Sequence, residues 1–175
     1  MRLLLLLAFG LLATLLSGCS QPAAKPAPWV TYTSPDGKFT AKFPKEPRRV
    51  EALIPMEKPL TKVYVALLND QLTFEIKYRD RDPPHQDAEL LEKAPASMAR
   101  SMHGTLRDNR PITLDQWQGR AFSYSAVEND VPMRHHVRLY TVGDRLYVLS
   151  VFGRQELLDD GEADEFLRSF MVNEK

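Results

Sequence analysis

The sequence contains a single cysteine, Cys19, among its 175 residues. One thiol excludes an internal disulfide and a zinc site built from several thiolates. An excess of one charge is also missing, because 23 Lys and Arg residues balance 23 Asp and Glu residues. A chain without net charge gains little by releasing counterions from a phosphate backbone, so the sequence predicts no nucleic-acid partner.

Long hydrophobic runs are missing too, except for one at the amino terminus. After Met1 and Arg2, the segment from Leu3 to Leu16 is apolar apart from Thr14. A helix of this length extends about 21 Å, which is too short for a hydrocarbon core of about 30 Å. The run is therefore typical of the core of a signal peptide.

The residues that end this run, Leu16, Ser17, Gly18 and Cys19, resemble the lipobox of bacterial lipoproteins. The resemblance implies that residues 1–18 form a lipoprotein signal peptide, that cleavage leaves Cys19 first, and that its thiol receives diacylglycerol. Two or three acyl chains on one cysteine hold a protein on a membrane, whereas a single chain binds only marginally. The alternative is an ordinary secretory peptide in which Cys19 is incidental.

Ser20 follows the cysteine in place of Asp, which resembles the outer-membrane sorting signal of enteric lipoproteins. We therefore expect a lipid-anchored protein of the bacterial cell envelope that faces the periplasm, on the outer rather than the inner membrane.

Residues 19–28 have the composition of a tether. Ser20 to Pro28 include three prolines and no large apolar side chain, so this segment cannot build a core. In the polyproline conformation it extends about 28 Å at about 3.1 Å per residue. Residues 29–175 follow without another linker or an internal repeat, which predicts one globular domain.

Alternating apolar and polar residues predict that most of the domain is β-structure. Leu72, Phe74, Ile76 and Tyr78 show the two-residue period of a half-buried strand. The segment Arg145–Phe152 is apolar on both faces, which predicts a central strand that is covered on both sides. With the intervening turn signals, we expect strands at 29–33, 38–43, 49–54, 61–68, 72–78, 105–114, 120–127, 132–142 and 145–153.

One helix is predicted in the middle of the chain. Asp87 is a candidate cap, and an apolar stripe follows it before Gly104. Because Pro95 falls within the stripe, we expect a kink there or two short helices. The stripe consists of Leu91, Ala94, Met98 and Met102.

A second helix is predicted at about 160–172. Asp159 and Glu162 have the spacing of a capping box, and runs of strands joined by tight turns around two helices indicate an α+β domain with an antiparallel sheet. The expected buried face of this helix is Ala163, Phe166, Leu167, Phe170 and Met171.

This layout and several local motifs resemble the PsbP/Mog1-like superfamily. The motifs are Tyr32-Thr-Ser-Pro-Asp-Gly-Lys-Phe39, Phe43-Pro44, Leu146-Tyr-Val-Leu149 and Phe166-Leu-Arg-Ser-Phe170. The resemblance spans about 29–175 and implies an α/β/α sandwich around a largely antiparallel sheet. It also implies a noncatalytic binding or assembly module, and it transfers no catalytic residue to this chain.

The four histidines do not predict a metal site. His135 and His136 are consecutive in an expected strand, so their side chains point to opposite faces. A shared metal would need His85 or His103 from a distant part of the chain. We expect one of the consecutive histidines in the core or against an aromatic ring and the other in solvent.

Six acids between Glu156 and Glu165 lack the alternating ligands of a calcium loop and instead precede a helix, whose amino end favours negative charge. No Gly-rich phosphate loop is present, and no nucleophile elbow surrounds the candidate serines. We therefore expect no metal, no cofactor and no enzymatic activity. These serines are Ser34, Ser123, Ser125 and Ser150.

Two features are candidate partner surfaces. Arg134, His136 and Arg138 share one face of an expected strand and form what we call the basic stripe. It suits an acidic partner, lipid headgroups or peptidoglycan, and a solvated sheet face is the alternative. Trp117, in an expected loop, is either an anchor for a partner or a lid over the edge of the core.

These observations favour a lipid-anchored, noncatalytic envelope protein that docks on another protein or an envelope assembly. The alternative is a carrier of a small ligand or lipid, with an apolar pocket between the sheet and the helix that contains Pro95. An enzyme is the third hypothesis, and it requires a base within hydrogen-bond reach of a nucleophile.

Overall fold

The computed structural model describes residues 28–36, 38–51, 62–68, 71–81, 87–158 and 160–173. The predicted signal peptide and Cys19 lie outside these ranges, and so does Asp159 of the predicted capping box.

Ten strands and two helices make up the described part of the chain. The helices are α1 (Asp87–Ser101) and α2 (Asp160–Arg168). The strands are β1 (Val30–Thr33), β2 (Phe39–Phe43), β3 (Arg48–Glu51), β4 (Lys62–Leu68), β5 (Leu72–Asp80), β6 (Thr105–Leu114), β7 (Trp117–Glu128), β8 (Val131–Val142), β9 (Arg145–Arg154) and β10 (Met171–Val172).

The strands form two antiparallel sheets. The large sheet has seven strands in the order β3-β4-β5-β9-β8-β7-β6, and the small sheet has the order β1-β2-β10. The α+β class is therefore confirmed, and so is the central position of β9, which has three strands on each side. The antiparallel pairing is confirmed as well, and the sequence did not predict the separate small sheet, in which β2 pairs with both β1 and β10.

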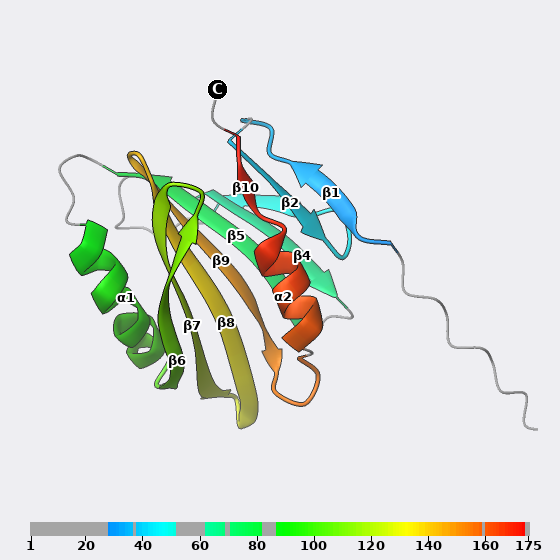
Figure 1. Cartoon of the computed structure of the whole chain (residues 1–175). Helices are drawn as coiled ribbons and strands as arrows, with labels where there is room; N and C mark the ends of the chain where they lie inside the picture. The colour runs from blue at the N-terminus through cyan, green and yellow to red at the C-terminus, as the bar shows by residue number, and fades with distance from the viewer. Residues whose placement is uncertain are drawn as a thin grey trace, which may run out of the picture.

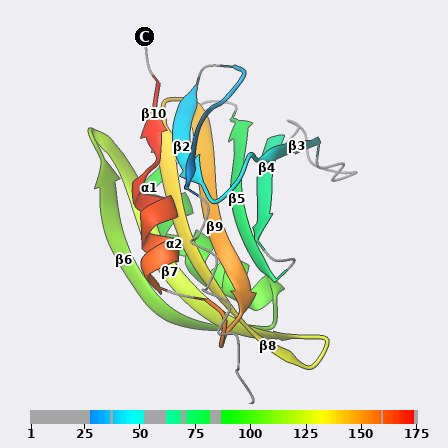
Figure 2. The same cartoon turned by 90° about the vertical axis from the view of Figure 1, so that its right-hand side faces the viewer.

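The two faces of the large sheet carry different layers. Figures 1 and 2 show α2 and the small sheet on one face and α1 on the other. The helix α2 packs on β8, β9 and β2, whereas α1 packs on β6 and β7. Each face therefore has its own apolar core.

The main core lies between the large sheet, the small sheet and α2, with Phe39 of β2 at its centre. Phe39 is fully buried, and its ring contacts aromatic rings from β4, β5 and β9 and from the segment after α2. Such edge and tilted contacts stabilise aromatic clusters beyond the burial of apolar area. The ring centroids lie 5.2 Å away for Tyr64, 6.3 Å for Tyr78, 6.3 Å for Tyr147 and 5.8 Å for Phe170.

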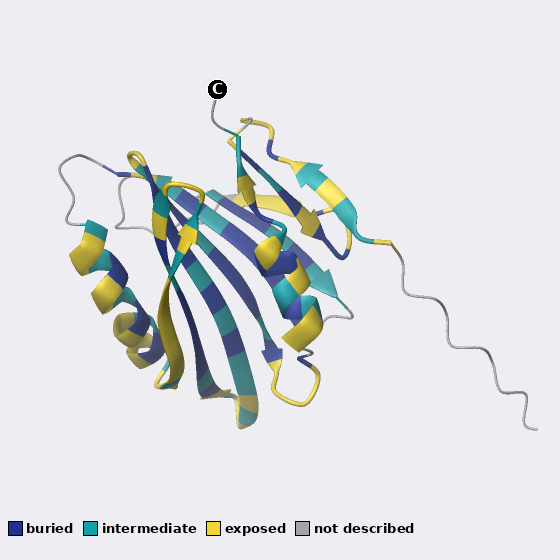
Figure 3. Cartoon of the chain, viewed as in Figure 1, coloured by how far each residue is buried: buried dark blue, intermediate teal, exposed yellow. Residues whose placement is uncertain are grey.

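A smaller core joins α1 to the opposite face of the sheet. Leu91 and Ala99 of α1 are buried together with Phe122, Val137 and Leu139 of the strands below. Figure 3 shows the matching pattern, in which the outward side of α1 is exposed. The helix is thus held by a single apolar stripe.

One continuous helix passes through Pro95, so the prediction of two short helices is wrong. An interior proline removes one hydrogen bond and costs about 3 kcal/mol. Pro95 is itself buried, and it lies one turn from Leu91 and one turn from Ala99 on the sheet-facing side. Burial of Leu91, Pro95 and Ala99 against the sheet offsets the free-energy cost of the proline.

The helix α2 ends at Arg168, four residues earlier than predicted. Ser169 follows it, and its hydroxyl donates to the carbonyl of Phe166 at 2.7 Å and accepts from the amide of Lys42 at 2.8 Å. Met171 then pairs with Thr40 of β2. Tertiary pairing with β2 has therefore replaced the last turn of the predicted helix.

The predicted buried face of this segment is correct in four of its five positions. Met171 is the exception, because 57% of it is exposed. As a strand residue, Met171 follows the alternation of β10 rather than the helical period. The four buried residues are Ala163, Phe166, Leu167 and Phe170.

We predict that Phe39→Ala lowers the free energy of unfolding by about 3–5 kcal/mol, because it leaves a cavity among the surrounding rings. Val127→Ala is the control, since Val127 is 67% exposed and its truncation changes stability by less than about 0.5 kcal/mol. Chemical denaturation of both variants measures the difference. Equal losses in the two variants would contradict the central position of Phe39.

Candidate functional site

The basic stripe lies on β8, on the face of the large sheet that α2 covers. Arg134 Nη1 is 3.5 Å from Asp160 Oδ1, and His136 Nε2 is 3.3 Å from the same oxygen. Arg138 Nη2 is 3.5 Å from Asp164 Oδ1. Asp160, the first residue of α2, and Asp164, one turn later, thus face the stripe and balance much of its charge.

Exposure decreases along the stripe. The exposed fraction of the side chain is 36% for Arg134, 24% for His136 and 13% for Arg138. Arg138 also donates from Nη1 to the carbonyl of Leu167 at 3.1 Å, which holds its guanidinium against α2. Arg134 is therefore the member of the stripe that is most open to a partner.

Trp117 is the first residue of β7, so its predicted place in a loop is wrong. Its side chain is partly buried and packs against the main core, opposite Leu114 of β6. Ser125, the pairing partner of Arg134, lies eight positions further along β7, about 26 Å at about 3.3 Å per residue. The structure therefore does not bring Trp117 to the exposed end of the basic stripe.

The two consecutive histidines point to opposite faces of β8. His135 is buried between two aromatic rings, with centroids 4.3 Å from Tyr124 and 5.1 Å from Phe152. Its Nε2 lies 3.2 Å from Glu128 Oε1. The expected position of one histidine against an aromatic ring is confirmed, but the expectation of the other in solvent is wrong, because α2 covers most of His136.

Burial lowers the pKa of both histidines. For His135, the loss of hydration outweighs the attraction of the Glu128 carboxylate, which raises the pKa. For His136, the loss of hydration outweighs the opposite effect of Asp160. Both imidazoles are therefore held toward the neutral form.

Ser123 lies beside His136, directly across the pairing of β7 and β8. Its hydroxyl donates to Asp108 Oδ2 on β6 at 2.8 Å. The serine therefore connects two neighbouring strands through a carboxylate. Asp108, Ser123 and His136 line a polar depression of about 320 Å³ beside α2.

Asp36 is the centre of a polar cluster that the sequence did not indicate. It lies in the turn after β1, where its carboxylate accepts hydrogen bonds from the hydroxyls of Ser34 and Tyr78. Burial raises the pKa of Asp36, but these hydrogen bonds outweigh it, so the pKa is lowered. Because Tyr78 belongs to β5, the cluster fastens the small sheet to the large one.

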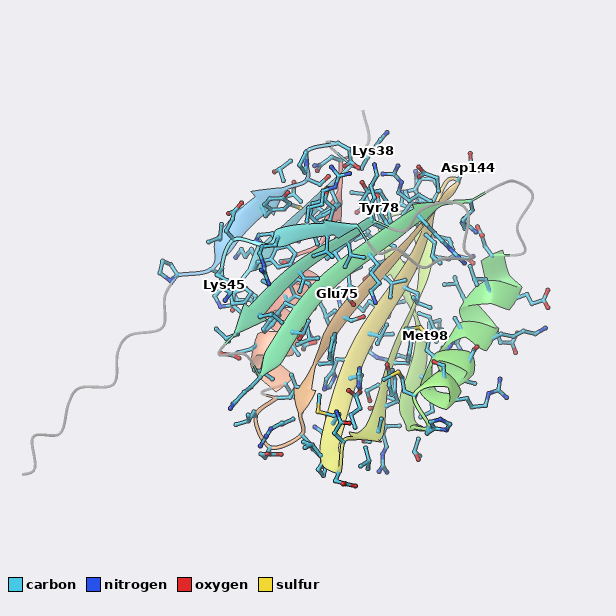
Figure 4. All side chains as sticks on the ribbon, turned by 180° about the vertical axis from the view of Figure 1, so that it is seen from behind. Lys38, Lys45, Glu75, Tyr78, Met98 and Asp144 are labelled. Atoms are coloured by element: carbon cyan, nitrogen blue, oxygen red, sulfur yellow. The ribbon has the colours of Figure 1, made fainter. Side chains whose placement is uncertain are left out.

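A groove of about 590 Å³ lies between α1 and the middle of the large sheet. Figure 4 shows Met98 on the side of α1 that faces the sheet. One end of the groove carries Arg79 of β5 and the helix residues Glu89 and Lys93, and Ser97 lies at its edge. Its apolar lining consists of Leu90, Ala94, Met98, Leu139, Leu146 and Val148.

The dimensions of the two layers explain this groove. Seven strands about 4.8 Å apart make a sheet about 29 Å wide, whereas one helix with its side chains is about 10 Å wide. Because α1 packs on β6 and β7 at one edge, it leaves the middle strands uncovered on this face. The groove lies where the small-ligand hypothesis requires a pocket.

The described ranges hold neither a metal-binding cluster nor a membrane-spanning helix. No group of three or more His, Cys, Asp or Glu side chains there could hold a metal ion. None of the helices there is long and apolar enough to cross a membrane.

Comparison with known proteins places the fold. No family model matches the chain, and no curated protein matches it. Among solved structures, the cyanobacterial PsbP (CyanoP) of Synechocystis sp. PCC 6803 is similar with a TM-score of 0.63 at 10% identity, over 86% of this chain and 95% of that one. The chain has a PsbP-like fold.

Two further structures are similar at a lower level. LpqN of Mycobacterium tuberculosis, described as involved in cell envelope biogenesis, has a TM-score of 0.51 at 10% identity, over 84% of this chain and 91% of that one. A protein from Bacteroides thetaiotaomicron has a TM-score of 0.51 at 12% identity over 83% of this chain, and the match spans only 48% of that protein. At these identities the likeness concerns the fold alone.

We predict that the protein loses stability as the pH falls below about 6.5. The pKa of each imidazole is lower in the folded protein than the value of about 6.5 in the unfolded chain, so the unfolded chain binds more protons in this range. The stabilisation is fully present above that value and is lost toward the folded pKa. Chemical denaturation at about pH 7.5 and about pH 5.5 measures the change.

The double variant His135→Phe with His136→Gln reduces this dependence, because Phe keeps a ring between Tyr124 and Phe152. Glu128 and Asp160, which face the two imidazoles, are unchanged in this variant. His103→Asn is the control, since Asn tolerates the positive φ of 50° at this position. If the double variant kept the same pH dependence of stability, the dependence would not come from His135 and His136.

Proposed function

We propose that the protein is a lipid-anchored, noncatalytic module of the bacterial cell envelope whose domain binds another protein or an envelope assembly. The observation that carries the proposal is the order of the segments along the sequence. A segment that resembles a lipobox and the tether-like residues 19–28 directly precede a domain with a PsbP-like fold. This order suits a domain that works at a membrane surface.

The comparisons support the envelope part of the proposal. LpqN, described as involved in cell envelope biogenesis, has this fold over most of its length.

Two polar side chains that were candidates for chemistry have structural partners instead. Ser123 donates to Asp108, and His135 lies within hydrogen-bond distance of Glu128. Binding, rather than catalysis, is the function that these arrangements favour.

The exposed end of the basic stripe is the proposed docking surface. Arg134 is its most accessible member, and its contact with Asp160 at 3.5 Å is solvent-exposed, so it contributes little to stability. An acidic partner can compete for such a guanidinium at small cost. His136 and Arg138 lie deeper against α2. We expect them to hold β8 against α2 rather than to contact the partner.

We predict that Cys19→Ala abolishes metabolic labelling by an alkyne-bearing fatty acid, because Cys19 is the sole cysteine of the sequence. Ser20→Asp is the matched control: it keeps the label but moves the protein from the outer-membrane to the inner-membrane fraction. Gel fluorescence of the fractions after coupling the alkyne to a dye measures both effects. Labelling that survives in Cys19→Ala would refute the anchor.

We also predict that a photo-cross-linking residue at position 134 captures one reproducible protein partner in intact cells. The same residue at position 100, on the exposed side of α1, captures none, because that side lies on the other face of the sheet. Capture is measured by mass spectrometry of the purified adduct. Identical adducts from both positions, or no protein adduct from position 134, would contradict the docking surface.

A further inference from the structure

We infer that the groove between α1 and the large sheet binds a single-chain amphiphile with a carboxylate head, of the fatty-acid class. The carboxylate lies at the Arg79 end, and the chain extends toward Met98. This site is separate from the basic stripe, which lies on the opposite face of the sheet. The inference depends on neither the lipid anchor nor a protein partner.

The groove is large enough for a ligand, and its lining is largely apolar. Its volume of about 590 Å³ falls within the range of about 300–1,000 Å³ that is usual for small-molecule sites. Leu139 and Leu146 are buried in its floor, whereas Leu90, Met98 and Val148 remain partly exposed. An alkyl chain in this position removes apolar surface from water on both sides of the groove.

The charged residues of the lining gather at one end of the groove. Arg79 pairs with Leu146 at the end of the sheet that carries the hairpin between β8 and β9. The amino end of α1 lies at this end too, because Asp87 forms an ion pair with Arg81, whose amide donates to the carbonyl of Asp144. Met98 lies toward the other end of the helix.

The electrostatics of the charged end favour an anion. Lys93 forms an ion pair with Glu89, one turn away on α1, and Arg79 faces them from the sheet. A guanidinium has five N–H donors, so Arg79 can donate hydrogen bonds to a ligand carboxylate in addition to a protein partner. The positive amino end of α1 adds to this preference.

Three other depressions among the described residues lack this combination. One of about 320 Å³ is lined by two Arg and two Asp residues. Another, of about 470 Å³, is lined by one Lys, one Arg and two Asp residues, and a third, of about 440 Å³, by one Glu and one Arg. Their charges balance, whereas the α1 groove has two cations and one acid beside a mainly apolar lining.

The test uses the full chain in whole-cell lysate that retains the membranes, and a palmitate probe that carries a diazirine and an alkyne. After irradiation, we expect adducts on the groove side of α1, at Leu90, Ala94 or Met98, that excess palmitate removes. Ala94→Trp fills the groove and abolishes these adducts. Ala96→Trp is the matched control, because Ala96 is exposed on the same helix and lies outside the groove.

Ser97→Trp is a second blocking variant, since Ser97 is exposed at the edge of the groove and its replacement does not disturb the core. Arg79→Gln weakens labelling by the palmitate probe about tenfold, the usual effect of losing a charged hydrogen bond. It leaves labelling by the matching alcohol probe unchanged. Arg100→Gln, in the exposed last turn of α1, affects neither probe.

Equal labelling of the exposed and groove sides of α1 would overturn the inference, and so would full labelling of both Trp variants. If Arg79→Gln reduced labelling by the palmitate and alcohol probes equally, the placement of the carboxylate at the Arg79 end would be wrong. Failure of the proposed anchor is distinguishable, because acylation maps to Cys19 and groove adducts map to α1. A chain that is not acylated at Cys19 can still form groove adducts on α1, and an acylated chain can lack them.

Discussion

The packing of Phe39 against rings from three strands of the large sheet is the contact on which the rest of the structure depends. It brings β2 over β4, β5 and β9, and Phe170 joins the same cluster from the end of the chain. The small sheet and α2 therefore share one face of the large sheet. Ser169 and the short strand β10 then close the chain against β2.

This arrangement leaves α1 alone on the other face, and the groove follows from that imbalance. One helix covers about two strands, so α1 packs on β6 and β7 and leaves the middle of the sheet with apolar side chains along an open groove. The face that carries two layers is filled instead by aromatic rings and by the ion pairs between β8 and α2.

The strand β8 shows how one sequence serves both faces. Consecutive residues of a strand point to opposite faces, so His136 contacts Asp160 of α2, whereas His135 stacks on Tyr124 beside Glu128. His135 is buried and His136 is partly buried, and for each the loss of hydration outweighs the attraction of neighbouring carboxylates. The basic stripe is consequently a contact within the domain for most of its length and a candidate docking surface only at Arg134.

The sequence by itself determined the α+β class, the strands with a two-residue period, the central position of β9 and the helix with the Leu91 stripe, because each depends on local periodicity. The tertiary structure decided the rest. Pairing of Met171 with Thr40 ended the last helix early, burial of Pro95 kept α1 whole, and α2 covered His136. The Asp36 cluster and the α1 groove combine segments distant in sequence, and no local pattern encodes which faces such segments will share.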